Sequence, residues 1–600
     1  MKIKNRNEIE EKYKWRLEDI VPSDEDWEVM FKQTEKLGKE LGKFDGKLDK
    51  AENILECLRF DDEVNGKLER LYVYAKMRKD EDCSREKYLA MVERINNLLV
   101  DLSQKSAYIQ PQLAANSKEF LSDLANRVEF QDYSYTLTLM AKNKEHTLST
   151  QEEVILAKTG LFSGIFQEAF GMFDNLDISF KSFKNSEGQK VELSHGLYGL
   201  MLQSQSRSDR KKAFESMFGA YRDMINTVAS LYTGNVKKNL FYSQARKYQN
   251  CLDRATSAED VPVSVYEKLV KCIESSLSSL HKYLRYRRRQ LGYKTLHLYD
   301  LHVPIVDGAS KGVEYEEACE TVKKALAPLG SEYAELLNSA FSDGWIDVQE
   351  NKGKRSGAYS WGCYGVHPYV LLNYQKTTHD IFTIAHELGH AMHSYYSNEN
   401  QPYAKAEYKI FVAEVASTVN EVLLLRYMLC DAKGEERKYL LSYLLDMFRT
   451  TVFRQTQFAQ FEYTAHKYAE EGKPLNAQTL SDIYYKLNEK YYKTSGVVND
   501  DLIRYEWARI PHFYNAFYVY KYATGLISAI CIADNILEKG ESAVNDYKRF
   551  LKAGGSMPPV EILKLAGVDL TSDAPYKQAM KIFDETLDEL INTENQSARI

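Results

Sequence analysis

The chain has 600 residues, of which 44% are hydrophobic and 28% are charged, as in folded proteins and unlike disordered ones. One hydrophobic core rarely fills this length, so we expect at least two subdomains. The net charge of -7 gives no reason to expect a nucleic-acid partner, and no apolar run of about 18 residues is present that would indicate a membrane span.

Helices dominate the predicted elements, because the chain has only 12 prolines and 30 glycines to interrupt them. Ser23 precedes three acidic residues, which predicts a helix start, and apolar residues keep helical spacing to about Leu41. Ser149 before Thr150 and Glu152 predicts another start. Similar periodicity covers four segments, 62–79, 84–108, 150–170 and 208–247. The predicted fold class is therefore mainly α.

One interruption of the helical pattern lies at residues 177–194. Apolar and polar side chains alternate there around residues 185–188, which predicts a β-hairpin. We place at this hairpin the boundary between an N-terminal helical region, 1–195, and a larger catalytic region, 196–600.

A second interruption lies at residues 344–375, which are rich in glycine and aromatic side chains. This segment ends in a predicted strand at 370–374, and a helix is expected to start near Thr378. That helix contains the most informative motif of the chain, HELGH at residues 386–390.

The motif has the spacing of a zinc site. Because one helical turn separates His386 from His390, both imidazoles lie on one face and can bind a single ion. Glu387 can reach water in the open coordination position and take its proton as the water attacks a peptide carbonyl. The alternative is an exposed helix that carries these residues without a function.

Catalytic zinc ordinarily has a third protein ligand. His393 shares the helix face but lies about 10 Å along the axis from His386, so it either supports the ligands from outside or packs. Glu414 lies in the apolar stretch 408–417, where a buried carboxylate is costly unless it is paired or metal-bound. Its spacing leaves a metal ligand and a buried salt bridge equally open. Glu421 follows at i+7 and can hydrogen-bond a zinc-binding histidine.

The segments HELGHAMHSYYS and PYAKAEYKIFVAEVASTVNE resemble oligoendopeptidase F, a bacterial member of the thimet-oligopeptidase-like zinc metallopeptidases. The resemblance extends through nearly the whole chain. Its further blocks are EKYKWRLEDIVPSDEDW near the N-terminus, HLYDLHVPIV at 297–306, WIDVQENKGKRSGAYSWG at 345–362, HPYVLLNY at 367–374 and IPHFYNAFYVYKYATG at 510–525.

The resemblance implies that His386, His390 and Glu414 bind one Zn²⁺ per chain and that Glu387 is the general base. It also implies a fold, a large helical ellipsoid of two lobes around a deep substrate channel with a small β element near the active site. Such a channel admits short unfolded peptides and excludes folded proteins.

Residues that contact the substrate are implied in the same way. The strand at 367–374, with His367 and Tyr369, is expected to pair with the peptide backbone by β-augmentation.

The aromatic segment from Pro511 to Tyr522 is the other implied contact. By itself such a stripe is more often core than catalysis, but the resemblance implies that His512 and tyrosines donate hydrogen bonds to the tetrahedral oxyanion. We favour Tyr520, then Tyr518, with Tyr522 as a substrate contact.

The leading hypothesis is a zinc endopeptidase that cleaves short oligopeptides in peptide turnover. An exopeptidase would use the same chemistry but needs a cluster that binds a terminal charge, and a peptide-binding scaffold would not need Glu387. The 8 cysteines include no C-x-x-C pair, and the N-terminal stretch has no apolar signal region, so we expect a cytoplasmic protein. The sequence does not determine the oligomeric state.

Overall fold

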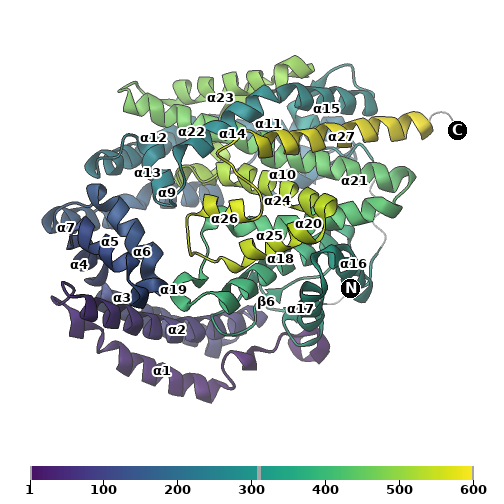
Figure 1. The fold of residues 1–600 in the computed structure, drawn as a ribbon. Helices are drawn as coiled ribbons and strands as arrows, with labels where there is room; N and C mark the ends of the chain where they lie inside the picture. Colours follow the sequence, from purple (N-terminus) through teal and green to yellow (C-terminus); the bar gives the residue numbers. More distant parts are fainter. Residues whose placement is uncertain (1–2, 307–311, 598–600) are drawn as a thin grey trace. The chain divides into compact units, whose positions relative to one another are not determined.

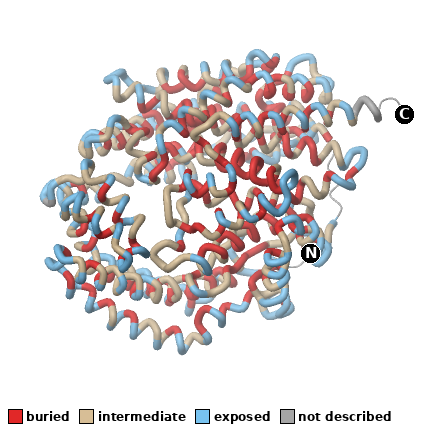
Figure 2. Tube along the Cα trace, viewed as in Figure 1, coloured by how far each residue is buried: buried red, intermediate tan, exposed pale blue. Residues whose placement is uncertain are grey.

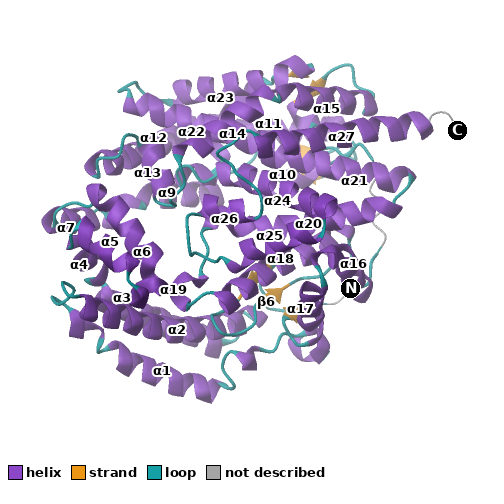
Figure 3. Ribbon diagram, in the orientation of Figure 1, coloured by secondary structure: helices purple, strands orange, loops and turns teal. Residues whose placement is uncertain are grey.

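The computed structural model describes residues 3–306 and 312–597 and consists mainly of helices (Figures 1 and 3). These residues also form seven strands of two or three residues each. The mainly α fold class predicted from the scarcity of proline and glycine is confirmed. Within the two described ranges, no helix combines the length and the apolar character needed to cross a membrane.

The chain folds into two compact units. Unit 1 contains residues 1–147, 310–428 and 529–568, and unit 2 contains residues 148–309, 429–528 and 569–600. The predicted boundary near residue 195 therefore does not coincide with the boundary between the units, because the chain passes from one unit to the other several times.

Unit 1 is built from helices on both sides of a small sheet. Its helices are α1 (Asp24–Gly38), α2 (Ala51–Glu81), α3 (Glu86–Ser106), α4 (Ile109–Ala115), α5 (Lys118–Asn126), α6 (Ser134–Lys142), α16 (Tyr315–Leu326), α17 (Ser331–Ser342), α18 (Thr378–Asn400), α19 (Tyr403–Ala406), most of α20 (Ile410–Asp431), α25 (Glu541–Lys552) and α26 (Pro559–Leu565). Trp27 of α1 is fully buried, and its indole N–H donates to the Leu71 carbonyl oxygen of α2 at 2.9 Å.

Unit 2 is almost entirely helical. Its helices are α7 (Thr150–Lys158), α8 (Gly160–Ser163), α9 (Ile165–Met172), α10 (His195–Met201), α11 (Arg207–Asp223), α12 (Ile225–Ala245), α13 (Cys251–Ser257), α14 (Val263–Ser275), α15 (Leu277–Gln290), α21 (Gly434–Met447), α22 (Arg454–Glu470), α23 (Ala477–Tyr492) and α27 (Ala574–Ser597), and α24 (Tyr520–Lys539) begins there. Strands β3 (Leu296–His297) and β7 (Val497–Val498) pair in parallel. Its core includes the stacked rings of Tyr232 and Phe461, which are both buried. Figure 2 shows how buried and exposed residues alternate along the helices of the described chain.

Local signals of the sequence are reproduced in several elements. The Ser23 hydroxyl accepts a hydrogen bond from Asp26 N–H at the start of α1, and Ser149 forms a reciprocal cap with Glu152 at the start of α7. Strands β1 (Phe183–Lys184) and β2 (Lys190–Val191) form the predicted hairpin. The predicted helices at 150–170 and 208–247 are each interrupted, the second one at Met224 between α11 and α12.

The sheet of unit 1 has the strand order β4-β6-β5. β4 (Ile346–Asp347) runs parallel to β6 (Tyr369–Leu371), and β5 (Tyr359–Trp361) runs antiparallel to it. Val370 of β6 is opposite Ile346 on one side and Ser360 on the other. The strand predicted at 370–374 is thus present at 369–371, where it is the central strand of three, and residues 372–374 lie beyond its end.

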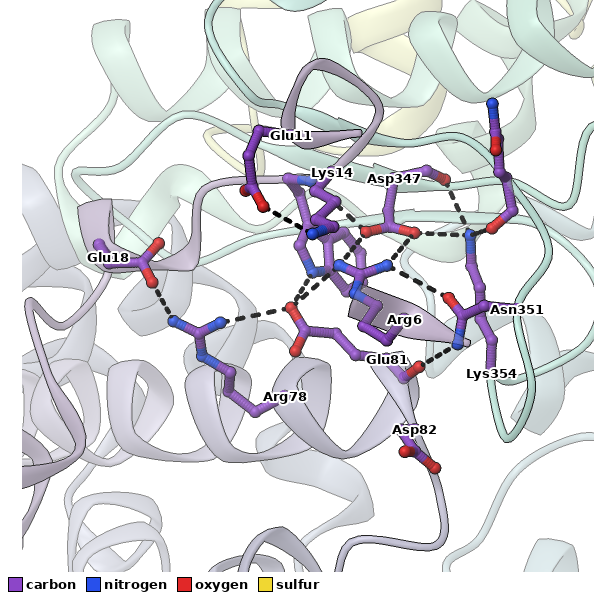
Figure 4. A network of polar contacts seen from close by, with 12 residues as sticks. Arg6, Glu11, Lys14, Glu18, Arg78, Glu81, Asp82, Asp347, Asn351 and Lys354 are labelled. Carbon is purple, nitrogen blue, oxygen red and sulfur yellow. Dashed lines mark hydrogen bonds and ion pairs between the residues drawn. The ribbon is translucent and has the colours of Figure 1, made fainter. Parts of the chain in front are cut away.

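A buried network of charges joins this sheet to the N-terminal segment and α2 (Figure 4). The Asp347 carboxylate of β4 is fully buried and pairs with Arg6 and, at 2.6 Å, with Lys354 Nζ. Glu81 of α2 accepts hydrogen bonds from the Trp15 indole at 2.8 Å and from Arg6 at 3.3 Å. Buried charges persist only when they are paired, so these contacts hold the loop before β5 in place.

Candidate metal centre

The predicted metal motif lies on α18, whose first turn is set by Thr377. The Thr377 hydroxyl accepts a hydrogen bond from Asp380 N–H at 3.2 Å, and the Asp380 carboxylate accepts one from Thr377 N–H at 2.7 Å. This reciprocal cap determines where the helix begins, which confirms the start predicted near Thr378. Leu388 is buried in the core, whereas His386 and His390 are partly exposed on the opposite face.

Helix α20 crosses α18 at Gly389. A Cβ added to Gly389 would lie 2.7 Å from the Ala416 carbonyl oxygen and 2.8 Å from the Ser417 nitrogen. Ordinary contacts between such atoms lie near about 3.5 Å, so only glycine permits the two backbones to approach this closely. The crossing places Glu414 and Glu421 of α20 beside the motif.

A buried amide holds the same crossing together. Asn420 of α20 is fully buried, and its Nδ2 donates to the Ala385 carbonyl oxygen of α18 at 3.0 Å. The hydroxyl of Tyr333, on α17, donates to Asn420 Oδ1 at 3.1 Å. Because an unpaired buried amide is costly, these bonds fix the angle and the register of α20 on α18.

Three potential ligand atoms converge where the helices cross. His386 Nε2 and His390 Nε2 lie 3.2 Å apart, and Glu414 Oε2 lies 3.5 Å from the first and 3.4 Å from the second. Three ligands bound tetrahedrally to one zinc ion at about 2.1 Å are separated by about 3.4 Å. Among the residues that the structure describes, this is the group of side chains that could hold a metal ion. Two imidazoles and a carboxylate are also the donor set of catalytic zinc, so the residues fit the ion.

Glu421 orients one of the ligands. Its Oε1 lies 2.6 Å from His386 Nδ1, which donates to it. The proton therefore resides on Nδ1, and the Nε2 lone pair points into the ligand triangle. Burial alone would lower the pKa of His386, but the Glu421 carboxylate outweighs it and raises that pKa. The hydrogen bond predicted for Glu421 from its i+7 spacing is present.

Glu387 lies beside the triangle and carries the remaining carboxylate of the motif. Its side chain is largely buried, and burial raises the pKa of Glu387 against the opposing effect of His386 and His390. A carboxylate in such a position is a suitable proton acceptor for a water bound between it and the metal site.

His393 packs and makes no contact with the ligands. It is fully buried, and its two ring nitrogens have no hydrogen-bond partner within the described part of the chain. Its ring stacks on Tyr408 with centroids 3.8 Å apart, and Phe550 lies 5.0 Å away. Burial lowers the pKa of His393 to about 3, so the ring is neutral. Of the two roles predicted for His393, these contacts favour packing over support of the ligands.

The strand predicted to bind substrate is the central strand of its sheet. β6 is paired with β4 on one side and β5 on the other, so both edges of its backbone are occupied. Tyr369 is fully buried, and its hydroxyl donates to the Arg16 carbonyl oxygen at 3.0 Å. Both observations weigh against a contact of this strand and of Tyr369 with a substrate, and their role in substrate binding stays a prediction. β5, at the edge of the sheet, packs against α18 instead.

His367 also has its polar atoms engaged. Its Nδ1 lies 3.0 Å from the Pro368 carbonyl oxygen, and its Nε2 lies 3.0 Å from Asp19 Oδ2. Its ring stacks on Trp345 with centroids 4.8 Å apart. A role of His367 in substrate binding stays a prediction.

The predicted oxyanion residues lie in unit 2, where the structure separates them. His512, Tyr518 and Tyr522 form one cluster, in which the rings of His512 and Tyr518 are stacked with centroids 6.1 Å apart. Tyr522 lies edge-on to both, and its hydroxyl is 3.4 Å from His512 Nε2. His512 is exposed, and the two tyrosines are partly exposed.

Tyr520 lies outside this cluster. It is 1% exposed, and its ring packs edge-on against Tyr266 with centroids 5.1 Å apart. This burial favours the other two tyrosines as substrate contacts, and the role of Tyr520 stays a prediction. Tyr518 and Tyr522 are the tyrosines whose exposure is compatible with the predicted role.

The sequence reasoning missed three features that shape the site. These are the contact at Gly389, the buried amide of Asn420 and the edge strand β5. Asn420 carries a signal that was available, because it is a polar residue within the apolar run of α20. Nothing in the neighbouring sequence predicts how closely the backbones approach at Gly389, or the order of the strands.

The chain matches two family models and is similar to several known proteins along most of its length. The family model described as "Peptidase family M3" matches residues 200–582, and the one described as "Oligopeptidase F" matches residues 113–180. The chain is 42% identical to oligopeptidase PepF of Bacillus subtilis over 98% of the chain and 88% of that protein. It is similar to the crystal structure of oligoendopeptidase-F from Enterococcus faecium, with a TM-score of 0.74 and 32% identity over 96% of this chain and 99% of that one. A crystal structure of a Chlamydophila abortus protein matches with a TM-score of 0.93 and 35% identity, over 99% of this chain and all of that one.

Proposed function

Because the chain belongs to peptidase family M3 and is a metalloendopeptidase that cleaves oligopeptides, we propose that it does so with one Zn²⁺ ion held by His386, His390 and Glu414. The observation that carries this proposal is the ligand triangle, whose sides of 3.2, 3.4 and 3.5 Å match tetrahedral zinc. The proposed substrates are short unfolded peptides, cut at internal bonds.

A zinc ion at this site supplies Lewis acidity, which polarises the peptide carbonyl and makes water nucleophilic near neutral pH. Glu387 accepts the proton of the attacking water and passes it to the leaving amine. Glu421 keeps the proton of His386 on Nδ1, so that the other ring nitrogen stays available as a ligand.

The edge strand β5 is the proposed partner of the peptide backbone. It lies against α18, and within the described residues no strand pairs with its outer edge. An extended peptide that adds to this edge would gain main-chain hydrogen bonds whatever its side chains, which suits an enzyme acting on varied peptides.

His512, Tyr518 and Tyr522 are the proposed hydrogen-bond donors to the substrate. Support comes from the resemblance of the segment at 510–525 and from the cluster that these three side chains form in unit 2. Donors aimed at the oxyanion stabilise the transition state more than the ground state, so their loss should lower kcat more than it raises KM.

The test is mass spectrometry of the products from a graded series of peptides, with and without a zinc chelator. We expect internal cuts confined to short peptides, and no cleavage after chelation. The Glu387→Gln variant should retain one zinc per chain and lose at least a thousandfold in kcat, because only the base is removed. Glu399→Gln on the exposed end of the same helix is the matched control and should cleave normally.

Two results would contradict the proposal. Stepwise loss of residues from one peptide end would indicate an exopeptidase. Undiminished turnover by Glu387→Gln with zinc bound would remove Glu387 from the role of base.

A further inference from the structure

The loop that precedes α24 contains a residue in an unusual conformation. Phe517 has a φ of 56°, in the left-handed region that bulky side chains rarely adopt because it is strained. Its side chain is 2% exposed and packs near His466, with ring centroids 4.7 Å apart, and near Tyr266 at 5.9 Å. Because the surroundings must stabilise this conformation, the contacts of the Phe517 backbone matter.

The stabilising contact comes from a buried carboxyl group. Glu462 of α22 is fully buried, and its Oε1 accepts a hydrogen bond from Phe517 N–H at 2.6 Å. Its Oε2 has no hydrogen-bond partner within the described ranges. Burial raises the pKa of Glu462 to about 8, against the opposing effects of the Phe517 N–H and Lys521. A buried acid with half of its bonding capacity unused is costly, and stability alone gives no reason to keep it.

Buried hydrogen bonds fix the backbone of α22 at Glu462 and join this helix to α12. One turn after Glu462, His466 bonds the Glu462 carbonyl oxygen through Nδ1 at 2.8 Å and Asn239 Nδ2 through Nε2 at 3.2 Å. The three residues are buried, so these bonds fix the part of α22 from which the Glu462 carboxyl group reaches the loop.

The left-handed turn decides where the neighbouring side chains go. The Phe517 ring enters the core of unit 2, whereas the ring of the next residue, Tyr518, is partly exposed and stacks with His512. Tyr522 then meets Tyr518 edge-on with centroids 5.4 Å apart. The φ of Phe517 sets the direction of the chain between the core ring and the cluster, so a change in this angle would move Tyr518 relative to Phe517.

We propose that Glu462 is a positioning residue, which holds the left-handed backbone of Phe517 and thereby orients Tyr518 and Tyr522 toward His512. This inference rests on the proposed function, in which those three side chains donate hydrogen bonds to the substrate.

The experiment compares Glu462→Gln with Glu462→Met in the full-length zinc enzyme. Glutamine keeps a carbonyl oxygen as acceptor for Phe517 N–H, whereas methionine has similar length and no comparable acceptor. We expect Glu462→Gln to retain kcat within about threefold, and Glu462→Met to lose about ten- to a hundredfold in kcat with KM nearly unchanged. Zinc content should stay at one per chain in both variants, since the ligands lie in the other unit. Gln457→Leu, another buried polar residue of α22, is the control and should keep its kcat.

A transition-state analogue, a phosphinic peptide, gives a second readout. Its affinity should fall in Glu462→Met by the same factor as kcat, while substrate affinity does not change. If Glu462→Met does not fold, Glu462→Ala replaces it in the same comparison.

Three outcomes would overturn the inference. They are an unchanged kcat in the apolar variant, a loss of thermal stability without a loss of kcat, and equal losses in the glutamine and methionine variants. A failure of the proposed function itself is distinguishable, because the wild-type enzyme with zinc bound would then cleave no peptide.

Discussion

The contact between α18 and α20 makes Gly389→Ala the most informative single substitution. The added Cβ would meet the Ala416 carbonyl oxygen at 2.7 Å and the Ser417 nitrogen at 2.8 Å, both of them backbone atoms that cannot rotate away. Restoring ordinary separations of about 3.5 Å from these two atoms requires the helices to move apart by at least about 0.7–0.8 Å, and Ser417 Cα, which the Cβ would meet more closely still, requires more. Glu414 lies less than one turn before Ser417 on α20 and would move with it.

This displacement is large for a metal site. Zinc–ligand distances tolerate about 0.2 Å, so the triangle of His386, His390 and Glu414 would open beyond what one ion can bridge. We expect the substitution to lower zinc affinity at least tenfold, and to destabilise unit 1 by about 1–3 kcal/mol through overpacking.

The assay is metal analysis after dialysis against graded concentrations of a zinc buffer, together with denaturant unfolding of the metal-free protein. The control is Gly219→Ala in the middle of α11, where an added Cβ meets nothing within 4 Å. That variant should gain about 0.5–1 kcal/mol, because alanine favours the helix over glycine. Wild-type zinc affinity in Gly389→Ala would refute the reasoning, since it would show that the crossing does not set the ligand geometry.

The remaining predictions concern the ligand set and the buried network of unit 1. Glu414→Ala should abolish zinc retention in dialysis. Glu421→Ala should weaken zinc retention about ten- to a hundredfold and leave some activity at saturating zinc. Equal losses of zinc in the two variants would make Glu421 a ligand itself. Asp347→Asn should destabilise the protein by about 3–5 kcal/mol, because Lys354 and Arg6 lose their buried partner. The control is Asp101→Asn, in an exposed pair with Lys105, which should cost about 0–1 kcal/mol. Burial alone would raise the pKa of Asp347, but Lys354 and Arg6 outweigh it and hold that pKa below its usual value, so its contribution is present above about pH 4 and is lost as the pH falls further. The difference in melting temperature between wild type and Asp347→Asn should therefore be constant near neutral pH and shrink in acid.

Features that depend only on residues close together in the chain could be predicted from sequence patterns. Ser23 and Thr377 mark helix starts because a cap is formed within one turn of the chain. The pairing of His386 with His390 follows from helical spacing, and the rise per residue excludes His393 as a third ligand. These conclusions need no knowledge of what packs against the helix.

Features that join distant segments could not be predicted in this way. The choice between β6 and β5 as the peptide-binding strand depends on which strand is central, and strand order depends on pairing across the sheet. The choice among Tyr518, Tyr520 and Tyr522 depends on the φ of Phe517, which a buried carboxyl from another helix stabilises.

Glu414, the proposed third metal ligand, shows most clearly the difference between features that depend on neighbouring residues and features that depend on distant segments. Residue type and spacing predict that Glu414 is a carboxylate in an apolar helix, and they leave a metal ligand and a buried salt bridge equally open. Only the tertiary structure brings its Oε2 within 3.4–3.5 Å of both imidazoles. The physical reason is the close crossing at Gly389, because the absence of one Cβ lets two backbones meet and places a carboxylate where the helix of the motif cannot supply one.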